Sequence, residues 1–203
     1  MADPAYIVNG VLTDGEAWVG IAHASLSLPA TVCTFTSTND GQTGDFSQYM
    51  DFVLVYYGRT DRVSTSDAMK VTVNNDTTNG NYSMQRLYGY GGSASTNSSS
   101  SHLYRFGELN CPAASSPANV FGAGVIRCFD VNSGKYKSNV LTSASDGWSA
   151  VGSTADGWVH LQGNTWKSQA PITEFDITPT FGTNLVAGSK FSLFGILPRM
   201  VTA

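Results

Sequence analysis

Charged side chains are scarce in this chain of 203 residues: they make up 13% of it, against about 25% in an average globular domain. Glutamate is the rarest of them and is present only as Glu16, Glu108 and Glu174. Solvent-exposed helix faces normally carry many Glu and Lys residues. Ser, Thr, Asn and Gly take the place of the missing charges, and several of them favour tight turns. This composition predicts an all-β protein.

The chain also lacks any run of Lys or Arg, and its net charge is −4. Binding to nucleic acid through the phosphates requires a basic patch, so we expect no nucleic-acid partner. Nowhere do 18 apolar residues follow one another, so the sequence predicts no membrane-spanning segment and no membrane partner.

Cysteines are few, and their number is odd. Cys33, Cys111 and Cys128 are widely and irregularly spaced, which is typical neither of a disulfide framework nor of a zinc site. We expect three buried free thiols, in a protein that is made and assembled in a reducing cytoplasm.

Strand patterns and turn dipeptides are frequent along the chain. Residues 49–57 (YMDFVLVYY) are apolar on both sides, which predicts a central strand covered on both faces. In residues 69–74 the apolar Met69, Val71 and Val73 alternate with polar residues and should face inward. Further strands are expected at residues 103–106, 125–131, 136–141, 158–161, 172–177 and 191–196. Short strands separated by turns in this way indicate a β-sandwich, a barrel or a jelly roll.

Two regions differ from this pattern. Residues 1–45 alternate less regularly, so they are either opening strands of the domain or an N-terminal arm that contacts a partner. Residues 46–203 form the main β domain. Within it, residues 91–101 (GGSASTNSSSS) have almost no apolar surface to bury and are predicted to form a flexible surface loop.

Signs of catalytic chemistry are weak. Residues 147–152 (GWSAVG) lack the second glycine of a nucleophile elbow and are better explained as a turn entering a strand. His23, His102 and His160 are scattered, without the spacing of metal ligands. His160 is expected to point outward from its strand, and His102 to be solvated beside the serine-rich loop. We therefore predict a non-enzymatic protein without catalytic residues, cofactor or metal.

Two polar groups have simple structural explanations. Glu174 and Asp176 fall on the same side of one strand, which suits a solvent-facing acidic pair better than the opposed carboxylates of a glycoside hydrolase. Residues 74–76 (NND), with Asn79 and Asn81, are rich in oxygen ligands for Ca²⁺ but lack the spacing and the closing glutamate of an EF-hand. A hairpin turn held by Asn and Asp side chains is the favoured explanation.

The aromatic residues leave two functions open. Trp148, Trp158, Trp166, Tyr88 and Tyr90 are able to form a platform on which sugars stack, or to fill a core or a subunit interface. The second explanation is favoured here, because aromatic residues are common in both places.

Residues 187–196, in the C-terminal segment, read AGSKFSLFGI. This sequence resembles the ending G-S-x-F-S-L-Y-G-I of a diffuse group of tailed-phage structural proteins, with Phe194 where tyrosine is usual. Residues 49–82 and 125–137 agree with it in character, so that the resemblance extends over residues 46–196, and the first 45 residues have no counterpart.

This resemblance implies a jelly-roll-like antiparallel β-sandwich that assembles as a homotrimer. It implies a capsid decoration, or cement, protein on the virion surface, whose partner is the major capsid protein and which stabilises the shell. Related chains also occur in tails and fibres, so the alternative is a tail or receptor-binding module that recognises host glycans through exposed aromatic residues. Neither implies catalytic residues.

Overall fold

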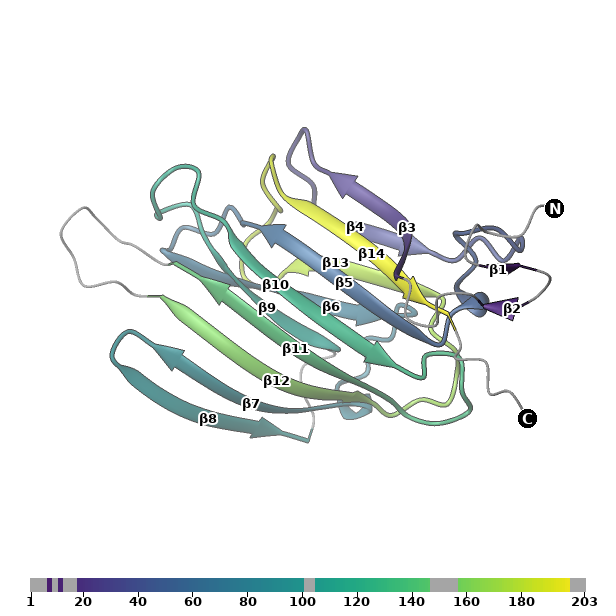
Figure 1. Cartoon of the computed structure of the whole chain (residues 1–203). Helices are drawn as coiled ribbons and strands as arrows, with labels where there is room; N and C mark the ends of the chain where they lie inside the picture. Colours follow the sequence, from purple (N-terminus) through teal and green to yellow (C-terminus); the bar gives the residue numbers. More distant parts are fainter. Residues whose placement is uncertain (1–6, 9–10, 13–17, 101–104, 147–156, 198–203) are drawn as a thin grey trace.

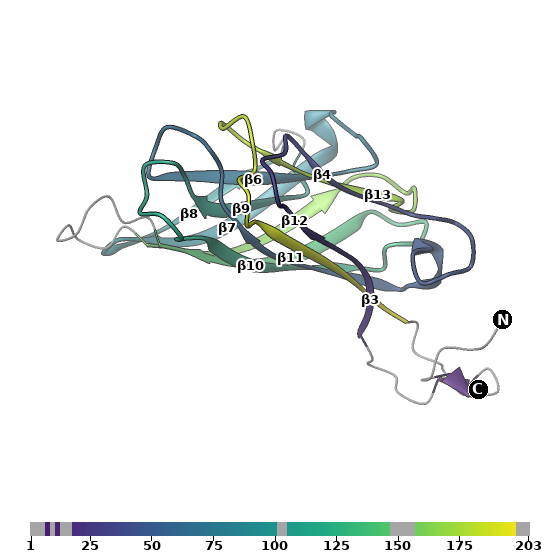
Figure 2. The same cartoon turned by 90° about the horizontal axis from the view of Figure 1, so that it is seen from above.

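The computed structural model describes residues 7–8, 11–12, 18–100, 105–146 and 157–197. Residues 18–197 of this part form two facing sheets of antiparallel strands (Figures 1 and 2). Its helical segments are the single 3-10 turns η1 (Phe46–Gln48) and η2 (Asn79–Asn81). Among the residues described, no helix has the length and apolar character needed to cross a membrane.

The larger sheet has eight strands and the smaller sheet four. In spatial order the larger sheet contains β3 (Trp18–Ser25), β14 (Lys190–Ile196), β5 (Asp51–Gly58), β10 (Gly122–Phe129), β11 (Lys137–Ser145), β12 (Trp158–Trp166), β7 (Tyr82–Tyr90) and β8 (Ser93–Ser99). The smaller sheet contains β4 (Cys33–Thr36), β13 (Glu174–Pro179), β6 (Ser66–Val73) and β9 (Gly107–Pro112). The short strands β1 (Ile7–Val8) and β2 (Val11–Leu12) pair with each other in a separate sheet.

The strands pair in a nested order. β3 pairs with β14, β4 with β13, β5 with β10 and β6 with β9, so the first strand of the sandwich pairs with its last and the inner strands follow in turn. The hairpin β7–β8 lies between β6 and β9 in the sequence, and β11–β12 lies between β10 and β13; both extend the larger sheet. The prediction of an all-β antiparallel sandwich is confirmed, whereas its jelly-roll part stays a prediction.

β5 runs through the middle of the larger sheet. Phe52, Leu54 and Tyr56 on its inner side are buried in the core, as expected from the apolar run at 49–57. Val53 on its outer side is also buried, but Tyr57 near its end is exposed, so coverage on both faces is limited to the first half of the strand.

The three thiols are free and buried, as predicted from their spacing. Burial, together with the nearby charge of Asp176, raises the pKa of Cys33 to about 11. A thiol with so high a pKa is protonated at neutral pH and is therefore a weak nucleophile.

Part of the N-terminal segment belongs to the sandwich. β3 and β4 both lie within residues 1–45 and occupy an edge of the larger and of the smaller sheet, respectively. Residue 45 is therefore no domain boundary for residues 18–45.

The prediction of a flexible loop at residues 91–101 is wrong for residues 93–99. These form β8, an edge strand whose seven residues pair in register with β7. Because backbone hydrogen bonds to β7 hold the strand, its small polar side chains can stay exposed on both sides without burying apolar surface.

The larger sheet extends beyond the smaller one. β9 is the last strand of the smaller sheet on this side, and it packs against β10, β11 and β12. β8 and the second half of β7, from Arg86 to Tyr90, therefore lie beyond the cover, as Figure 1 shows below β9, whereas Tyr82 and Met84 at the start of β7 are buried. We call the inner side of this uncovered part the overhang. It is formed by Arg86, Tyr88 and Tyr90 of β7, Ser93, Ser95 and Asn97 of β8, and Trp158 at the neighbouring end of β12.

Candidate functional site

The polarity of β12 is inverted relative to that of an ordinary sandwich strand. His160, Gln162 and Asn164 point inward and are buried, whereas the apolar Val159 and Leu161 point to the outside of the larger sheet. The prediction that His160 points outward is therefore wrong: its side chain is covered by β9, and the residue is only 2% exposed. Strand alternation separated the two faces correctly, but the polar face is the inner one.

The apolar side chains on the outside of the larger sheet lie next to one another. In register across four strands, Val125 of β10 is opposite Thr142 of β11, Thr142 is opposite Leu161 of β12, and Leu161 is opposite Leu87 of β7. We call this surface the outer face; it consists of this row and of Val140 and Val159 in the two flanking rows. Its exposed large apolar residues are Leu87, Val140, Val159 and Leu161.

Charge is nearly missing from the outer face. At the outward positions of β7, β10, β11 and β12 the one charged side chain is Arg127, whose guanidinium lies 5.4 Å from the ring centroid of Phe129. A surface that gathers exposed apolar side chains and carries little charge is typical of a site of interaction.

On the inner side, three aromatic residues form a cluster at the overhang. Trp158 is directly opposite Tyr90 in the β7–β12 register, with ring centroids 4.1 Å apart, and it stacks on Tyr88 at 5.7 Å. We call these three residues the aromatic platform. Tyr90 is 40% exposed, so the platform is accessible at its outer end.

His160 lies beneath the aromatic platform in a network that sets its tautomer. The Gln162 amide donates to the Glu108 carbonyl oxygen at 2.9 Å and accepts from the Glu108 backbone N–H at 3.4 Å, which fixes its orientation. The same Gln162 Nε2 lies 3.2 Å from His160 Nδ1 and is a donor, so Nδ1 accepts and Nε2 carries the hydrogen. Burial and the nearby Arg86 lower the pKa of His160 to about 4, so its ring is neutral at pH 7.

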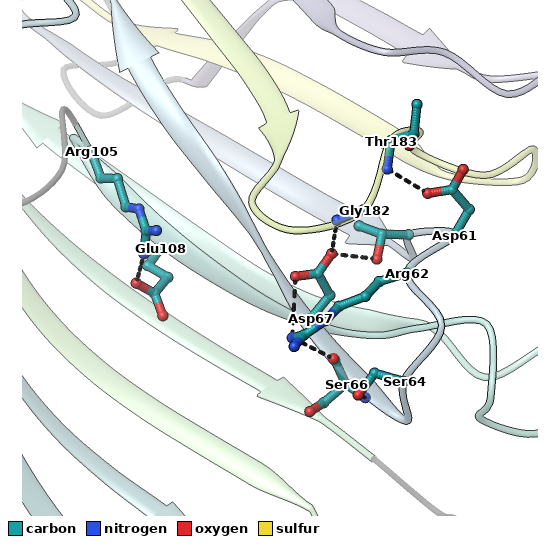
Figure 3. Close-up of polar contacts among 10 residues, drawn as sticks. Asp61, Arg62, Ser64, Ser66, Asp67, Arg105, Glu108, Gly182 and Thr183 are labelled. Atoms are coloured by element: carbon teal, nitrogen blue, oxygen red, sulfur yellow. Dashed lines mark hydrogen bonds and ion pairs between the residues drawn. The ribbon is translucent and has the colours of Figure 1, made fainter.

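Two arginines share one carboxylate at the edge of the overhang. Arg86 of β7 donates to Glu108 Oε1 at 2.9 Å, and Arg105, just before β9, contacts Glu108 Oε2 (Figure 3). The Arg86 guanidinium also lies 4.8 Å from the ring centroid of Tyr88. No sequence motif pointed to these residues, because Arg86 on β7 of the larger sheet meets Arg105 and Glu108 at β9 of the smaller sheet only when the two sheets pack together.

A second group of carboxylates in Figure 3 serves to hold loops. Asp67 accepts from Thr60 Oγ1 at 2.8 Å and from Gly182 N at 3.0 Å. Asp61 accepts from Thr183 N at 2.7 Å. These bonds tie the loop after β13 to the connection between β5 and β6, which is a structural role.

The Asn-rich segment is a turn, in agreement with the favoured explanation. Asn74 and Asn75 both have positive φ angles, near 52° and 54°. Asp76 accepts from the Thr78 backbone N–H at 2.9 Å and from Trp166 Nε1 at 2.7 Å. The turn continues into the 3-10 turn η2 (Asn79–Asn81).

Acid should destabilise the protein partly through Asp76. Although burial raises the pKa of this carboxyl, hydrogen bonds from Trp166, Asn81 and Thr78 outweigh burial and hold the pKa below its usual value. A lowered pKa in the folded state gives stability that is complete above the unfolded pKa of about 3.9 and is lost as pH falls through the folded value. We expect Asp76→Asn to lower the free energy of unfolding by about 1–3 kcal/mol at pH 7. The difference from wild type should shrink between pH 5 and pH 2 in urea titrations, and a constant difference would contradict this role.

Glu174 and Asp176 share a strand face as predicted, but Asp176 does not face solvent. Its carboxylate accepts from Thr34 Oγ1 at 2.5 Å, because the edge strand β4 covers it. Burial and the neighbouring Asp176 raise the pKa of Glu174, whose carboxylate also accepts from Asn75 Nδ2. The expectation of a solvent-facing pair is therefore wrong for Asp176.

The remaining candidates are dispersed. Trp166 is buried in the core and His23 is exposed on β3, where its Nδ1 lies 2.8 Å from Ser192 Oγ. His102, Trp148 and the rest of residues 147–152 lie outside the described residues.

The described ranges contain no group of three or more His, Cys, Asp or Glu side chains placed to bind a metal ion. The overhang and the outer face are the two surfaces of the described residues that are suited to binding a partner. In comparisons with protein-family models, with curated proteins and with solved structures, the chain has no significant match.

Proposed function

We propose that this chain is a non-enzymatic virion protein of a tailed phage, a capsid decoration protein that binds the major capsid lattice and stabilises the shell. The observation that carries the proposal is the outer face, where Leu87, Val140, Val159 and Leu161 are exposed on one side of a broad sheet. A decoration protein must stay in solution before assembly and then bind repeated sites through a large, shallow surface. An apolar face without strong charge is suited to such binding.

The nested strand order supports the jelly-roll part of the proposal. When a long antiparallel hairpin of eight strands is rolled up, its first strand pairs with its eighth, its second with its seventh, and so on inward. The four pairs β3–β14, β4–β13, β5–β10 and β6–β9 follow this order and alternate between the two sheets. Jelly rolls of this kind are common in viral capsid domains.

Self-association as a homotrimer is part of the proposal. Cyclic assembly would place three copies of the outer face around one axis and multiply modest contacts with the capsid. The mass of the purified protein in solution, measured by light scattering, tests this point separately from capsid binding.

Copy number in the particle tests the proposed function directly. We expect quantitative mass spectrometry of purified virions to give a ratio to the major capsid protein near a simple lattice fraction, because decoration repeats with the shell. Particles without the protein should lose their DNA at a lower temperature than complete particles. A handful of copies per particle would instead favour a tail or fibre module, and absence from the particle would contradict both virion functions.

The alternative, a tail or receptor-binding module for host glycans, is favoured by one observation, the aromatic platform at the overhang. Both functions place the protein on the virion surface. They differ in copy number and in whether loss of the protein reduces shell stability or host adsorption.

A further inference from the structure

The overhang offers polar groups beside its aromatic rings. On the inner side of β8, Ser93 is opposite Tyr90, Ser95 is opposite Tyr88 and Asn97 is opposite Arg86. The β8 side chains are exposed, and two successive ones on the same face are roughly 7 Å apart. Rows of hydroxyl and amide groups next to aromatic rings match the chemistry of a sugar, which has polar edges and an apolar C–H face.

Two buried N–H groups under the aromatic platform have no partner among the residues described. These are Trp158 Nε1 and His160 Nε2, the second of which must be a donor because Nδ1 accepts from Gln162. The two rings are close, with centroids 5.5 Å apart. Both nitrogens are covered in the folded chain, so a ligand brings acceptor oxygens to them only if the rings above them shift. A hydrogen bond formed in this way would satisfy a donor that is otherwise unpaired and costly to bury.

The charges of the overhang favour an anionic ligand. Arg86 and Arg105 share the single carboxylate of Glu108, and His160 is neutral at pH 7, which gives these four residues a net charge of about +1. The Nε atoms of both arginines also lack partners within the described part of the chain. Guanidinium groups bind carboxylates in a charge-assisted and often bidentate manner.

From these three features we infer that the overhang is a binding site for acidic glycans, oligosaccharides that carry a carboxylate. The C–H face of one sugar ring packs on Tyr90 at the accessible end of the aromatic platform. The carboxylate lies toward Arg86, and the hydroxyl groups meet the serine row of β8. This site is on the opposite side of the sheet from the outer face, so a protein attached to a capsid through the outer face would display it to solvent.

Binding of a matched pair of oligosaccharides tests this inference on the full-length chain. The probes are trigalacturonic acid and its trimethyl ester, which differ in the free carboxylates, measured by isothermal titration calorimetry at low and at physiological ionic strength. We expect the acid to bind at least about tenfold more tightly than the ester, with the difference decreasing as salt is added. Tyr90→Ala should weaken binding of both probes, whereas Arg86→Gln should reduce the preference for the acid.

A control variant separates the site from general stickiness of aromatic residues. Tyr136 lies in the connection between β10 and β11 and is 59% exposed, so Tyr136→Ala should leave binding unchanged. Arg86→Lys keeps the positive charge and should retain part of the preference for the acid. If both variants at position 86 lose binding of the acid and the ester alike, unfolding and not loss of charge would explain the effect. Equal binding of acid and ester, or no binding of either at millimolar concentration, would overturn the inference. The proposed capsid attachment is tested by the copy number of the protein in virions. Failure of glycan binding would therefore not contradict capsid attachment.

Discussion

Replacing Phe52 with alanine is expected to lower the free energy of unfolding by about 3–5 kcal/mol, the usual cost of removing a buried phenylalanine ring. Phe52 is fully buried on β5, with ring centroids 4.8 Å from Phe46 and 5.6 Å from Phe175. Because Phe175 belongs to β13 of the smaller sheet, this one side chain connects the two layers. Urea unfolding followed by tryptophan fluorescence measures the effect.

A second phenylalanine on the same sheet provides the matched control. Phe129 of β10 points to the outer side and is 37% exposed, so Phe129→Ala should cost under about 1 kcal/mol. Equal losses in the two variants would mean that Phe52 does not join the sheets as described. Proportionate losses in thermal and urea unfolding would support a single cooperative sandwich.

Two carboxylates placed on the outer face should strongly weaken the proposed attachment to the capsid. We expect the double variant Val140→Asp and Leu161→Asp to bind capsids at least about 100-fold more weakly, because burying unpaired charge costs several kcal/mol. Both side chains are exposed on strands of the larger sheet, so the fold itself should be nearly unaffected. Co-sedimentation of purified protein with particles that lack it measures the affinity.

The control carries the same change of charge at a different place. Leu28 and Val63 are exposed apolar residues in loops, at 74% and 93%. The double variant Leu28→Asp and Val63→Asp should therefore bind like the wild type. If it loses affinity equally, long-range charge and not the outer face would control attachment.

Periodic apolar patterns predicted the core strands well. Met69, Val71 and Val73 are fully buried on β6, as their alternation indicated, and the run at 49–57 covers all of β5 except its last residue, Gly58. In these strands the apolar side faces the other sheet, so the pattern and the tertiary structure agree.

The overhang and the outer face were not predictable in the same way. In β12, alternation separates Leu161 from His160 but cannot tell which of the two faces the core, and here the polar side is the inner one. β8 has a single small apolar residue, Ala94, which is too little to reveal a strand, and only its pairing with β7 defines it. The meeting of Arg86 with Glu108 depends on which strands are neighbours, information that no short motif carries.

The nested pairing also determines the order in which the protein can fold during synthesis. β3 emerges early from the ribosome, yet its partner β14 comes last among the sandwich strands, with Trp18 opposite Ile196. Until β14 is made, β3 and β5 have a strand missing between them, and the nascent sheet exposes two open edges. Such long-range closure is slow and leaves intermediates prone to aggregation, so production should benefit from chaperones and from slower growth at low temperature.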